Sequence, residues 1–234
     1  MNRVALVTGV GPGLGAALAR RFAREGFHMG LVARKRDFIE TLASEISGSG
    51  RRALCVAADV GRPVEATAAV REVRANLGPI TALIHNASSA LGEGLAGTTP
   101  EDFEESWRVT TLGGFVCARE TAADMLAAGG GVMLFTGATS SVRGGNWLAF
   151  SSAKFALRGL AQSLARELWP RGVHVAHVVI DGLIAPRSDE RSSSDEPLLD
   201  PNRIAEAYWH LASQERSAWT LELDLRPHDE QFYV

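Results

Sequence analysis

Phe150 and Lys154 are the two residues whose types and spacing first suggest chemistry in this sequence. They lie four residues apart in a segment of helical character, so both side chains face the same way. An apolar run precedes them and leads into a hydroxyl-rich loop, Thr136-Gly137-Ala138-Thr139-Ser140-Ser141. A strand followed by a hydroxyl-rich loop and then by a helix with an inward lysine is an arrangement that predicts an active site. The ring at position 150 is unusual there, because it has no proton to give.

A second cluster of residues, rich in glycine, follows the first apolar run of the chain. Residues 4–7 are typical of a buried strand and residues 14–25 of a helix, and the glycine-rich stretch 8–15 joins them. A turn of this kind brings backbone amides at a helix start close to a pyrophosphate, and lets the helix lie close to the sheet. The residues that we expect to contact the phosphates are Gly9, Gly11, Gly13, Leu14 and Gly15.

The end of the second expected strand, residues 29–33, indicates which dinucleotide is bound. An acid at this point would accept hydrogen bonds from the ribose hydroxyl groups of NAD. Here Arg34 and Lys35 follow the strand, and two cations suit a 2′-phosphate instead. The sequence therefore favours NADP(H) over NAD(H). The alternative is that Arg34, Lys35 and Arg36 form a solvated charge cluster, although a helix start is an unfavourable place for positive charge.

Strands and helices alternate along the whole chain, with one helix expected over 100–127 and a last strand over 218–223, which predicts an α/β fold. The expected architecture is a doubly wound parallel sheet of about seven strands, with helices on both faces, in a single domain over residues 1–234. Ligands of such folds bind at the carboxyl ends of the strands. A long polar loop at 181–201 suggests a mobile lid over a small-molecule substrate. The polar residues at or just past the expected strand ends are Thr8, Arg34, Asp59, Asn86, Thr136 and Asp181.

Composition excludes several classes of function. Apolar residues make up 46% of the chain and charged residues 22%, which is ordinary for a globular domain. The net charge is −3 without a basic tract, so no nucleic-acid partner is expected. No apolar run approaches the roughly 20 residues of a membrane span, and no signal peptide is recognised. Cys55 and Cys117 are expected to be free thiols in the cytoplasm, and no Cys/His grouping has metal-ligand spacing.

Taken together, these motifs resemble the short-chain dehydrogenases/reductases over essentially the whole chain. The stretch 8–15 matches that family's cofactor motif, 85–88 (His-Asn-Ala-Ser) stands where Asn-Asn-Ala-Gly is usual, and 181–182 stands where Pro-Gly is usual. The resemblance implies a nicotinamide cofactor and hydride transfer between an alcohol and a carbonyl group. The further cofactor contacts that it implies are Asp59, Val60, Asn86, Ala87, Lys154 and Gly182. For Asp59, a helix-capping role is an alternative.

The catalytic positions of that family are mostly changed in this chain. The resemblance implies an Asn, a Ser, a Tyr and a Lys, with the tyrosine as general acid/base. Lys154 matches the lysine of Tyr-x-x-x-Lys, so Phe150 stands in the tyrosine position. The serine position, thirteen residues earlier, falls on Gly137, and the helix asparagine falls on Thr110. The chain looks like a divergent subgroup with phenylalanine in place of the tyrosine.

Three interpretations remain open at this stage. The first is an NADP(H)-dependent oxidoreductase with a relocated acid, either a hydroxyl group of the loop or Lys154 itself. The second is a reaction without net hydride transfer, such as dehydration, isomerisation or ring opening, with Asp181 or His85 as acid/base. The third is a catalytically silent nucleotide-binding scaffold. Losing a positioned acid typically lowers a rate by roughly 10²–10⁴-fold. The candidate catalytic residues are Lys154, Ser140, Ser141 and Asp181, although both serines and the aspartate also suit a structural role in their loops.

A homodimer or homotetramer is the expected assembly. In the family that the chain resembles, the helices matching 100–127 and 146–169 pack against a second subunit. The C-terminal region also carries apolar rings that suggest an interface. These rings belong to Trp209, Trp219, Phe232 and Tyr233.

Overall fold

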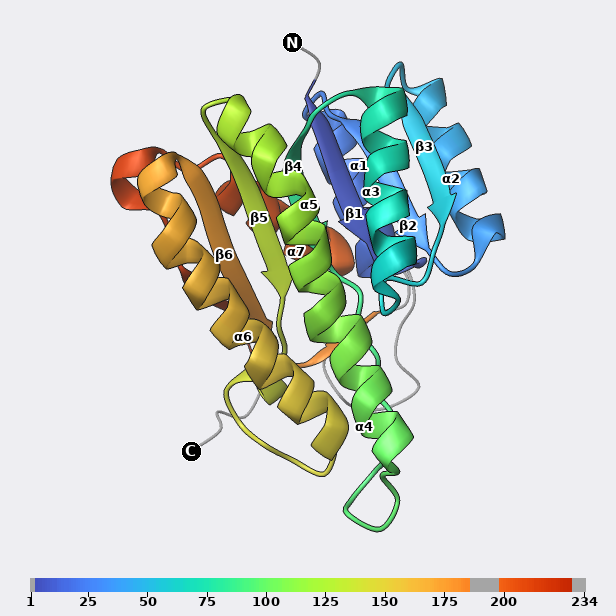
Figure 1. Ribbon diagram of the computed structural model, residues 1–234, viewed down its shortest axis with the longest axis vertical. Coiled ribbons are helices and arrows are strands. Elements are labelled where there is room, and N and C mark those ends of the chain that lie inside the picture. The colour runs from blue at the N-terminus through green and yellow to red at the C-terminus, as the bar shows by residue number, and fades with distance from the viewer. Residues whose placement is uncertain (1–2, 186–197, 229–234) are drawn as a thin grey trace.

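A computed structural model describes residues 3–185 and 198–228 and contains one seven-stranded parallel sheet (Figure 1). The strand order is β3-β2-β1-β4-β5-β6-β9, so the order reverses between β1 and β4. The predicted doubly wound fold is confirmed. The strands are β1 Val4–Thr8, β2 His28–Ala33, β3 Ala53–Ala57, β4 Ile80–His85, β5 Gly131–Thr136, β6 Val173–Ile180 and β9 Glu222–Leu225. Two short strands, β7 Leu183–Ile184 and β8 Leu198–Leu199, pair outside this sheet.

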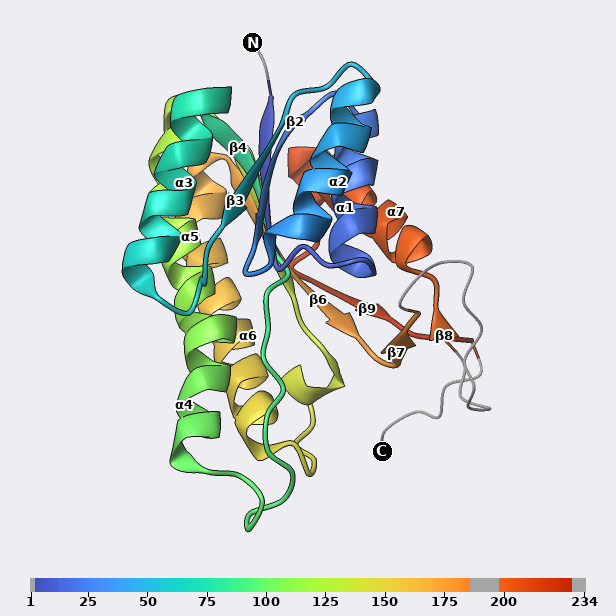
Figure 2. The same cartoon turned by 90° about the vertical axis from the view of Figure 1, so that its right-hand side faces the viewer.

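Helices cover both faces of the sheet, as Figure 2 shows edge-on. One face carries α1 Leu14–Arg24, α2 Arg36–Gly48 and α7 Pro201–Ala212, and the other carries α3 Pro63–Leu77, α5 Gly113–Ala127 and α6 Leu148–Leu168. The side chains of the central strands point alternately to the two faces. Two separate apolar clusters result, one under each helical layer. Among the described residues, no helix is both long and apolar enough to cross a bilayer.

The helix expected over 100–127 is interrupted. It begins as predicted, because Thr99 and Asp102 cap each other and Pro100 occupies the first turn of α4, Pro100–Trp107. A π-helical turn, Arg108–Leu112, then separates α4 from α5. At this turn the carbonyl oxygen of Thr110 accepts a hydrogen bond from the His85 ring at 3.0 Å. Helical periodicity does not reveal such a turn, because the contact that accompanies it is made with β4.

The last strand begins four residues later than the sequence indicates. Residues 218–223 were the expected strand, whereas Arg216–Ala218 form a 3-10 turn and β9 spans Glu222–Leu225. Trp219 turns inward and stacks on His174, with ring centroids 4.8 Å apart. Trp209 packs edge-on against Phe22 at 5.6 Å. Both partly buried tryptophans therefore pack against other rings of the same chain, and their part in an interface stays a prediction. Phe232, Tyr233 and residues 186–197 of the expected lid lie outside the described residues.

Candidate active site

An open cavity of about 510 Å³ lies at the carboxyl ends of β1, β2 and β4, on both sides of the point where the strand order reverses. It brings together eight of the residues predicted to contact the cofactor: Gly9, Gly11, Arg34, Lys35, Asp59, Val60, Asn86 and Ala87. Gly13, Leu14, Gly15, Lys154 and Gly182 do not line it. Gly13 is the residue before the first turn of α1, Leu14 begins that helix, and Gly182 follows β6. The role of all these residues as cofactor contacts stays a prediction.

The glycine-rich loop has the shape that a phosphate cradle requires. Gly9 has φ +72°, and a Cβ there would lie 2.5 Å from the backbone of Ala87. A Cβ on Gly15 would lie 2.7 Å from the Gly9 carbonyl oxygen, whereas one on Gly11 would meet nothing within 4 Å. Asn86 Nδ2 donates to the Gly9 carbonyl oxygen at 3.0 Å and so joins β4 to the loop. The loop is packed tightly on its inner side and open at Gly11, where the first amides of α1 are available to an anion.

Two cations stand at the rim of this cavity. Arg34 and Lys35 are exposed, and neither takes part in an ion pair with any described residue. Arg36 instead pairs with Glu40 of the same helix at 2.7 Å and does not line the cavity. The residues present therefore fit a dinucleotide that carries an additional phosphate group. Asp59 lines the cavity and accepts a hydrogen bond from the Gly61 amide at 2.9 Å, so it fixes the turn before α3, whose N-cap residue is Arg62.

Lys154 lies beneath this edge of the sheet, almost completely buried. Its Nζ donates to the carbonyl oxygen of Thr136 at 2.6 Å and lies 5.3 Å from the centre of the Phe150 ring. Burial lowers the pKa of Lys154 to about 7. An amine with such a pKa can give or take a proton near neutral pH. Phe150 therefore accompanies a side chain that can itself supply the proton that the ring lacks.

Gly137, at the serine position of the family, lies against the buried imidazole ring of His177. A Cβ on Gly137 would lie 2.4 Å from His177 Nε2, so no side chain fits there while the ring keeps its place. His177 is buried in β6, and its Nδ1 donates to Glu222 Oε2 at 3.0 Å. Burial lowers the pKa of His177 to about 4, so the ring is neutral at physiological pH. The signal that could have revealed this histidine is the glycine at a position where a side chain is usual.

The hydroxyl groups of the loop after β5 have different surroundings. Ser141 is buried, and its Oγ accepts from the Ala138 amide at 3.1 Å, so it fixes the turn. Thr139 Oγ1 donates to Asp181. Ser140 is half-buried and forms no side-chain hydrogen bond with the described residues. Of the predicted serines, Ser140 is the one whose hydroxyl group remains available to a ligand.

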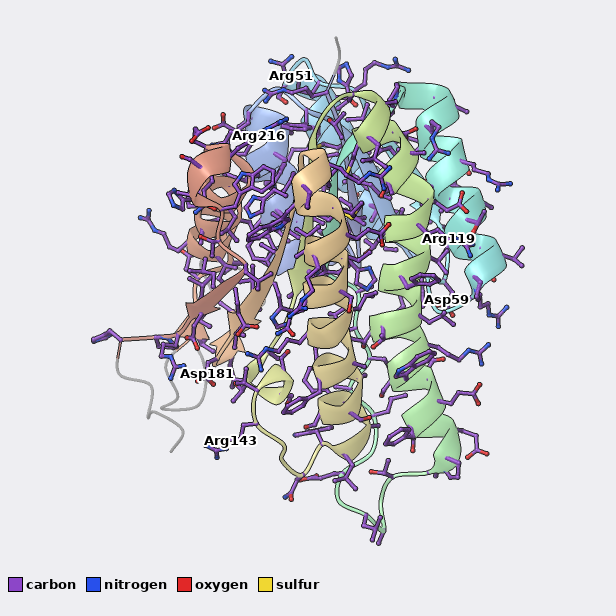
Figure 3. The ribbon with its side chains drawn as sticks, turned by 60° about the vertical axis from the view of Figure 1, so that its left-hand side comes forward. Arg51, Asp59, Arg119, Arg143, Asp181 and Arg216 are labelled. Carbon is purple, nitrogen blue, oxygen red and sulfur yellow. The ribbon has the colours of Figure 1, made fainter. Side chains whose placement is uncertain are left out.

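Asp181 is held at the end of β6 by contacts that favour an anchoring role. Besides the bond from Thr139, its carboxylate forms an ion pair with Arg226 at 3.1 Å. Figure 3 shows Asp181 well apart from Asp59 across the sheet end, so the two predicted acids do not share one site. Among the described residues, no three His, Cys, Asp or Glu side chains gather as a metal ion would require.

Two further buried side chains in this region, those of His85 and Tyr208, form hydrogen bonds within the chain. His85 Nε2 donates to the Thr110 carbonyl oxygen at 3.0 Å, and its Nδ1 accepts from the Thr8 hydroxyl group at 2.9 Å. Burial lowers the pKa of His85 to about 4, so this ring is neutral and both of its nitrogens are engaged. The Tyr208 hydroxyl group, which sequence reasoning did not single out, bonds to Thr136 Oγ1 at 2.8 Å. Burial raises the pKa of Tyr208, so it is no substitute for the missing tyrosine.

Comparison with known proteins assigns the family. A sequence profile described as short chain dehydrogenase matches residues 3–196. A short-chain dehydrogenase/reductase of Armillaria gallica is 33% identical over 179 residues, which cover 74% of this chain and 68% of the relative. The chain therefore belongs to the short-chain dehydrogenase/reductase family.

Solved structures agree with this assignment. A short-chain dehydrogenase from Rhodopseudomonas palustris is 38% identical, with a TM-score of 0.84 over 97% of this chain and all of that one. A metagenomic short-chain oxidoreductase in complex with NADP is 26% identical, with a TM-score of 0.83 over 96% and 97% of the two chains. Relatives named dehydrogenases and reductases support oxidoreductase activity in general.

Proposed function

We propose that this protein is an NADP(H)-dependent oxidoreductase that acts on an alcohol or carbonyl substrate, in a divergent subgroup with phenylalanine in place of the catalytic tyrosine. The observation that carries the proposal is the burial of Lys154 beside Phe150, which lowers the pKa of the amine to about 7. A proton donor thus exists at the correct end of the sheet without a phenol. When bound, the nicotinamide cofactor supplies the hydride chemistry.

Each part of the site has a role in this proposal. The amides of α1 and the loop 9–15 bind the pyrophosphate, and Arg34 with Lys35 binds the 2′-phosphate. Lys154 protonates the alkoxide that hydride transfer leaves on a carbonyl substrate, and Ser140 orients that oxygen. The family's asparagine and serine roles have no direct counterpart at Thr110 and Gly137. Slow turnover compared with a site that has a phenol is therefore part of the proposal.

Replacing Phe150 by tyrosine tests this function. We expect wild-type protein to reduce a panel of ketones and aldehydes slowly, and Phe150→Tyr to do so at least about tenfold faster, because the variant adds a positioned acid. The measurement is NADPH consumption at 340 nm for both proteins. Phe155→Tyr is a matched control, since Phe155 is exposed on the same helix. Absence of turnover in every protein, together with absence of cofactor in the purified chain, would favour the silent scaffold.

The cofactor preference rests on Arg34 and Lys35. We expect NADPH to bind about tenfold or more tightly than NADH, and Arg34→Ala to remove most of that difference, because a charge-assisted bond to the 2′-phosphate is lost. Titration of the fluorescence of each cofactor measures both affinities. Arg36→Ala is the control, because Arg36 pairs with Glu40 and lies outside the cavity. Equal affinity of the wild-type protein for the two cofactors would contradict the preference.

A homodimer or homotetramer is proposed on the exposed rings of the outer helices. Four aromatic side chains with 40–44% of their surface exposed lie on α4, α5 and α6: Phe103, Trp107, Phe115 and Phe155. Exposed rings that gather on neighbouring helices are typical of a contact face between subunits, and this arrangement supports the proposed assembly. Light scattering after size-exclusion chromatography should give at least twice the chain mass of 25.0 kDa. A monomeric mass at micromolar concentration would refute the assembly.

A further inference from the structure

Three side chains outside the predicted catalytic set form a continuous connection from α6 to β6. Arg158 of α6 donates through Nε and Nη2 to the two carboxylate oxygens of Glu222 in β9, both at 2.7 Å. Glu222 Oε2 also accepts from His177 Nδ1 at 3.0 Å. His177 is buried, whereas Arg158 and Glu222 are about one-third exposed. We call these three residues the brace. A bidentate guanidinium–carboxylate pair fixes direction as well as distance.

The brace contacts both segments that the Lys154–Thr136 hydrogen bond joins, namely α6 and the loop after β5. Arg158 follows Lys154 by one helical turn, so the two lie on the same face of α6. At its other end, the His177 ring fills the space beside Gly137, the residue after Thr136. The helix that carries the Nζ donor and the loop that carries the carbonyl acceptor are thus tied to one another through β6 and β9.

We propose that Arg158, Glu222 and His177 are positioning residues, which hold Lys154 Nζ in its buried place against the Thr136 carbonyl group. The inference rests on the proposed function only for the use that the reaction makes of Lys154. A lysine side chain has a long flexible stem, so the position of its amine depends on how firmly the flanking backbone is held. Without the brace, α6 and the loop after β5 are held together less firmly, and water gains access to Nζ.

Because of the groups that surround Lys154, its pKa depends mainly on how well its amine is shielded from water. His85 from β4 and His177 from β6 face it as neutral rings, because burial lowers the pKa of each to about 4. Arg158 and Glu222 carry opposite charges in direct contact. Burial is consequently the cause that lowers the pKa of Lys154 to about 7 from 10.5. Access of water to Nζ would raise that pKa toward its ordinary value.

The chain contains only two lysines, Lys35 and Lys154, so the test needs neither substrate nor cofactor. In a Lys35→Arg background, protein labelled with [ε-¹³C]lysine gives the signal of Lys154 alone, and its titration by NMR measures the pKa. The brace variant is Arg158→Met/Glu222→Met, which removes one charge of each sign. We expect it to raise the pKa of Lys154 by about 1–3 units.

A matched pair elsewhere separates positioning from general loss of stability. Arg74 and Asp124 form a similar ion pair at 2.8 Å between α3 and α5, in which the arginine is as exposed as Arg158 and the aspartate is more buried than Glu222. Arg74→Met/Asp124→Met should lower the melting temperature but leave the pKa of Lys154 near its wild-type value. Equal shifts in the brace and control variants would overturn the proposal.

A milder variant covers the case in which the brace variant does not fold. Glu222→Asp keeps the carboxylate, but its side chain is one methylene group shorter and cannot reach Arg158 and His177 together. We expect an intermediate rise in the pKa of Lys154, and an unchanged value would overturn the proposal. Because the titration is independent of turnover, failure of the oxidoreductase proposal and failure of the brace are distinguished.

Discussion

Carbonyl reduction by this protein should fall about tenfold for each pH unit above about 7 and should level off below that pH. Lys154 acts as an acid only in its ammonium form, and burial lowers its pKa to about 7. The ammonium form predominates below this pKa and is lost as the pH rises through it. The measurement is the pH profile of kcat and of kcat/KM at saturating NADPH, which separates the enzyme–substrate complex from the free enzyme.

Lys154→Met should lower kcat by roughly 10²–10⁴-fold, the usual effect of losing a positioned acid. A fluorescence titration with NADPH separates this loss from weaker cofactor binding. Lys35→Met is the control, since Lys35 stands at the rim of the cavity and should change cofactor affinity while the pH profile stays the same. A rate that is independent of pH between 6 and 9, or that survives Lys154→Met, would show that another group gives the proton. Ser140→Ala would then be the next comparison.

The fold could be predicted from the sequence because its signals are local. Short apolar runs alternate with helical segments, and each strand end carries a polar residue or a glycine turn. Alternation alone implies a parallel sheet, and right-handed connections limit the possible topologies. The π-turn at Arg108–Leu112 and the late start of β9 were missed, because each depends on a contact with a distant segment. Those contacts are the bond from His85 to Thr110 and the stacking of Trp219 on His174.

That most of the predicted cofactor residues gather at one cavity could be predicted for the same reason, whereas the surroundings of the catalytic positions could not. Gly9, Arg34 and Asn86 lie at three strand ends, and a parallel sheet brings such ends together. The position of an imidazole nitrogen beside Gly137 depends on the pairing of β5 with β6 and on the direction of one ring. Periodicity assigns His177 to a face of the sheet, but it does not identify the neighbours of that face. The sequence likewise offers three adjacent hydroxyl groups with equal weight, whereas Ser141 and Thr139 are engaged in the loop.

Gly137→Ser should be among the most destabilising single substitutions at this site, although it restores the residue usual in the family. Its Cβ would lie 2.4 Å from His177 Nε2 and 2.8 Å from the Val178 carbonyl oxygen, and both groups are buried. Overpacking of this kind typically costs about 1–3 kcal/mol in the free energy of unfolding. Chemical denaturation of wild type and variant measures it. Gly144→Ser is the control, since a Cβ on Gly144 meets nothing within 4 Å.

The same geometry predicts that removal of the ring makes room for the serine. In a His177→Ala background, Gly137→Ser should cost less than it does in the wild type, which gives a favourable coupling energy in the range of about 0.5–3 kcal/mol for residues in contact. The Val178 carbonyl oxygen stays in place, so the relief is incomplete. A coupling energy near zero would mean that the clash is relieved by movement of the loop and that His177 does not exclude the serine. A clear coupling would mean that the glycine and the histidine depend on one another, so that restoring the tyrosine at position 150 alone cannot rebuild the usual site.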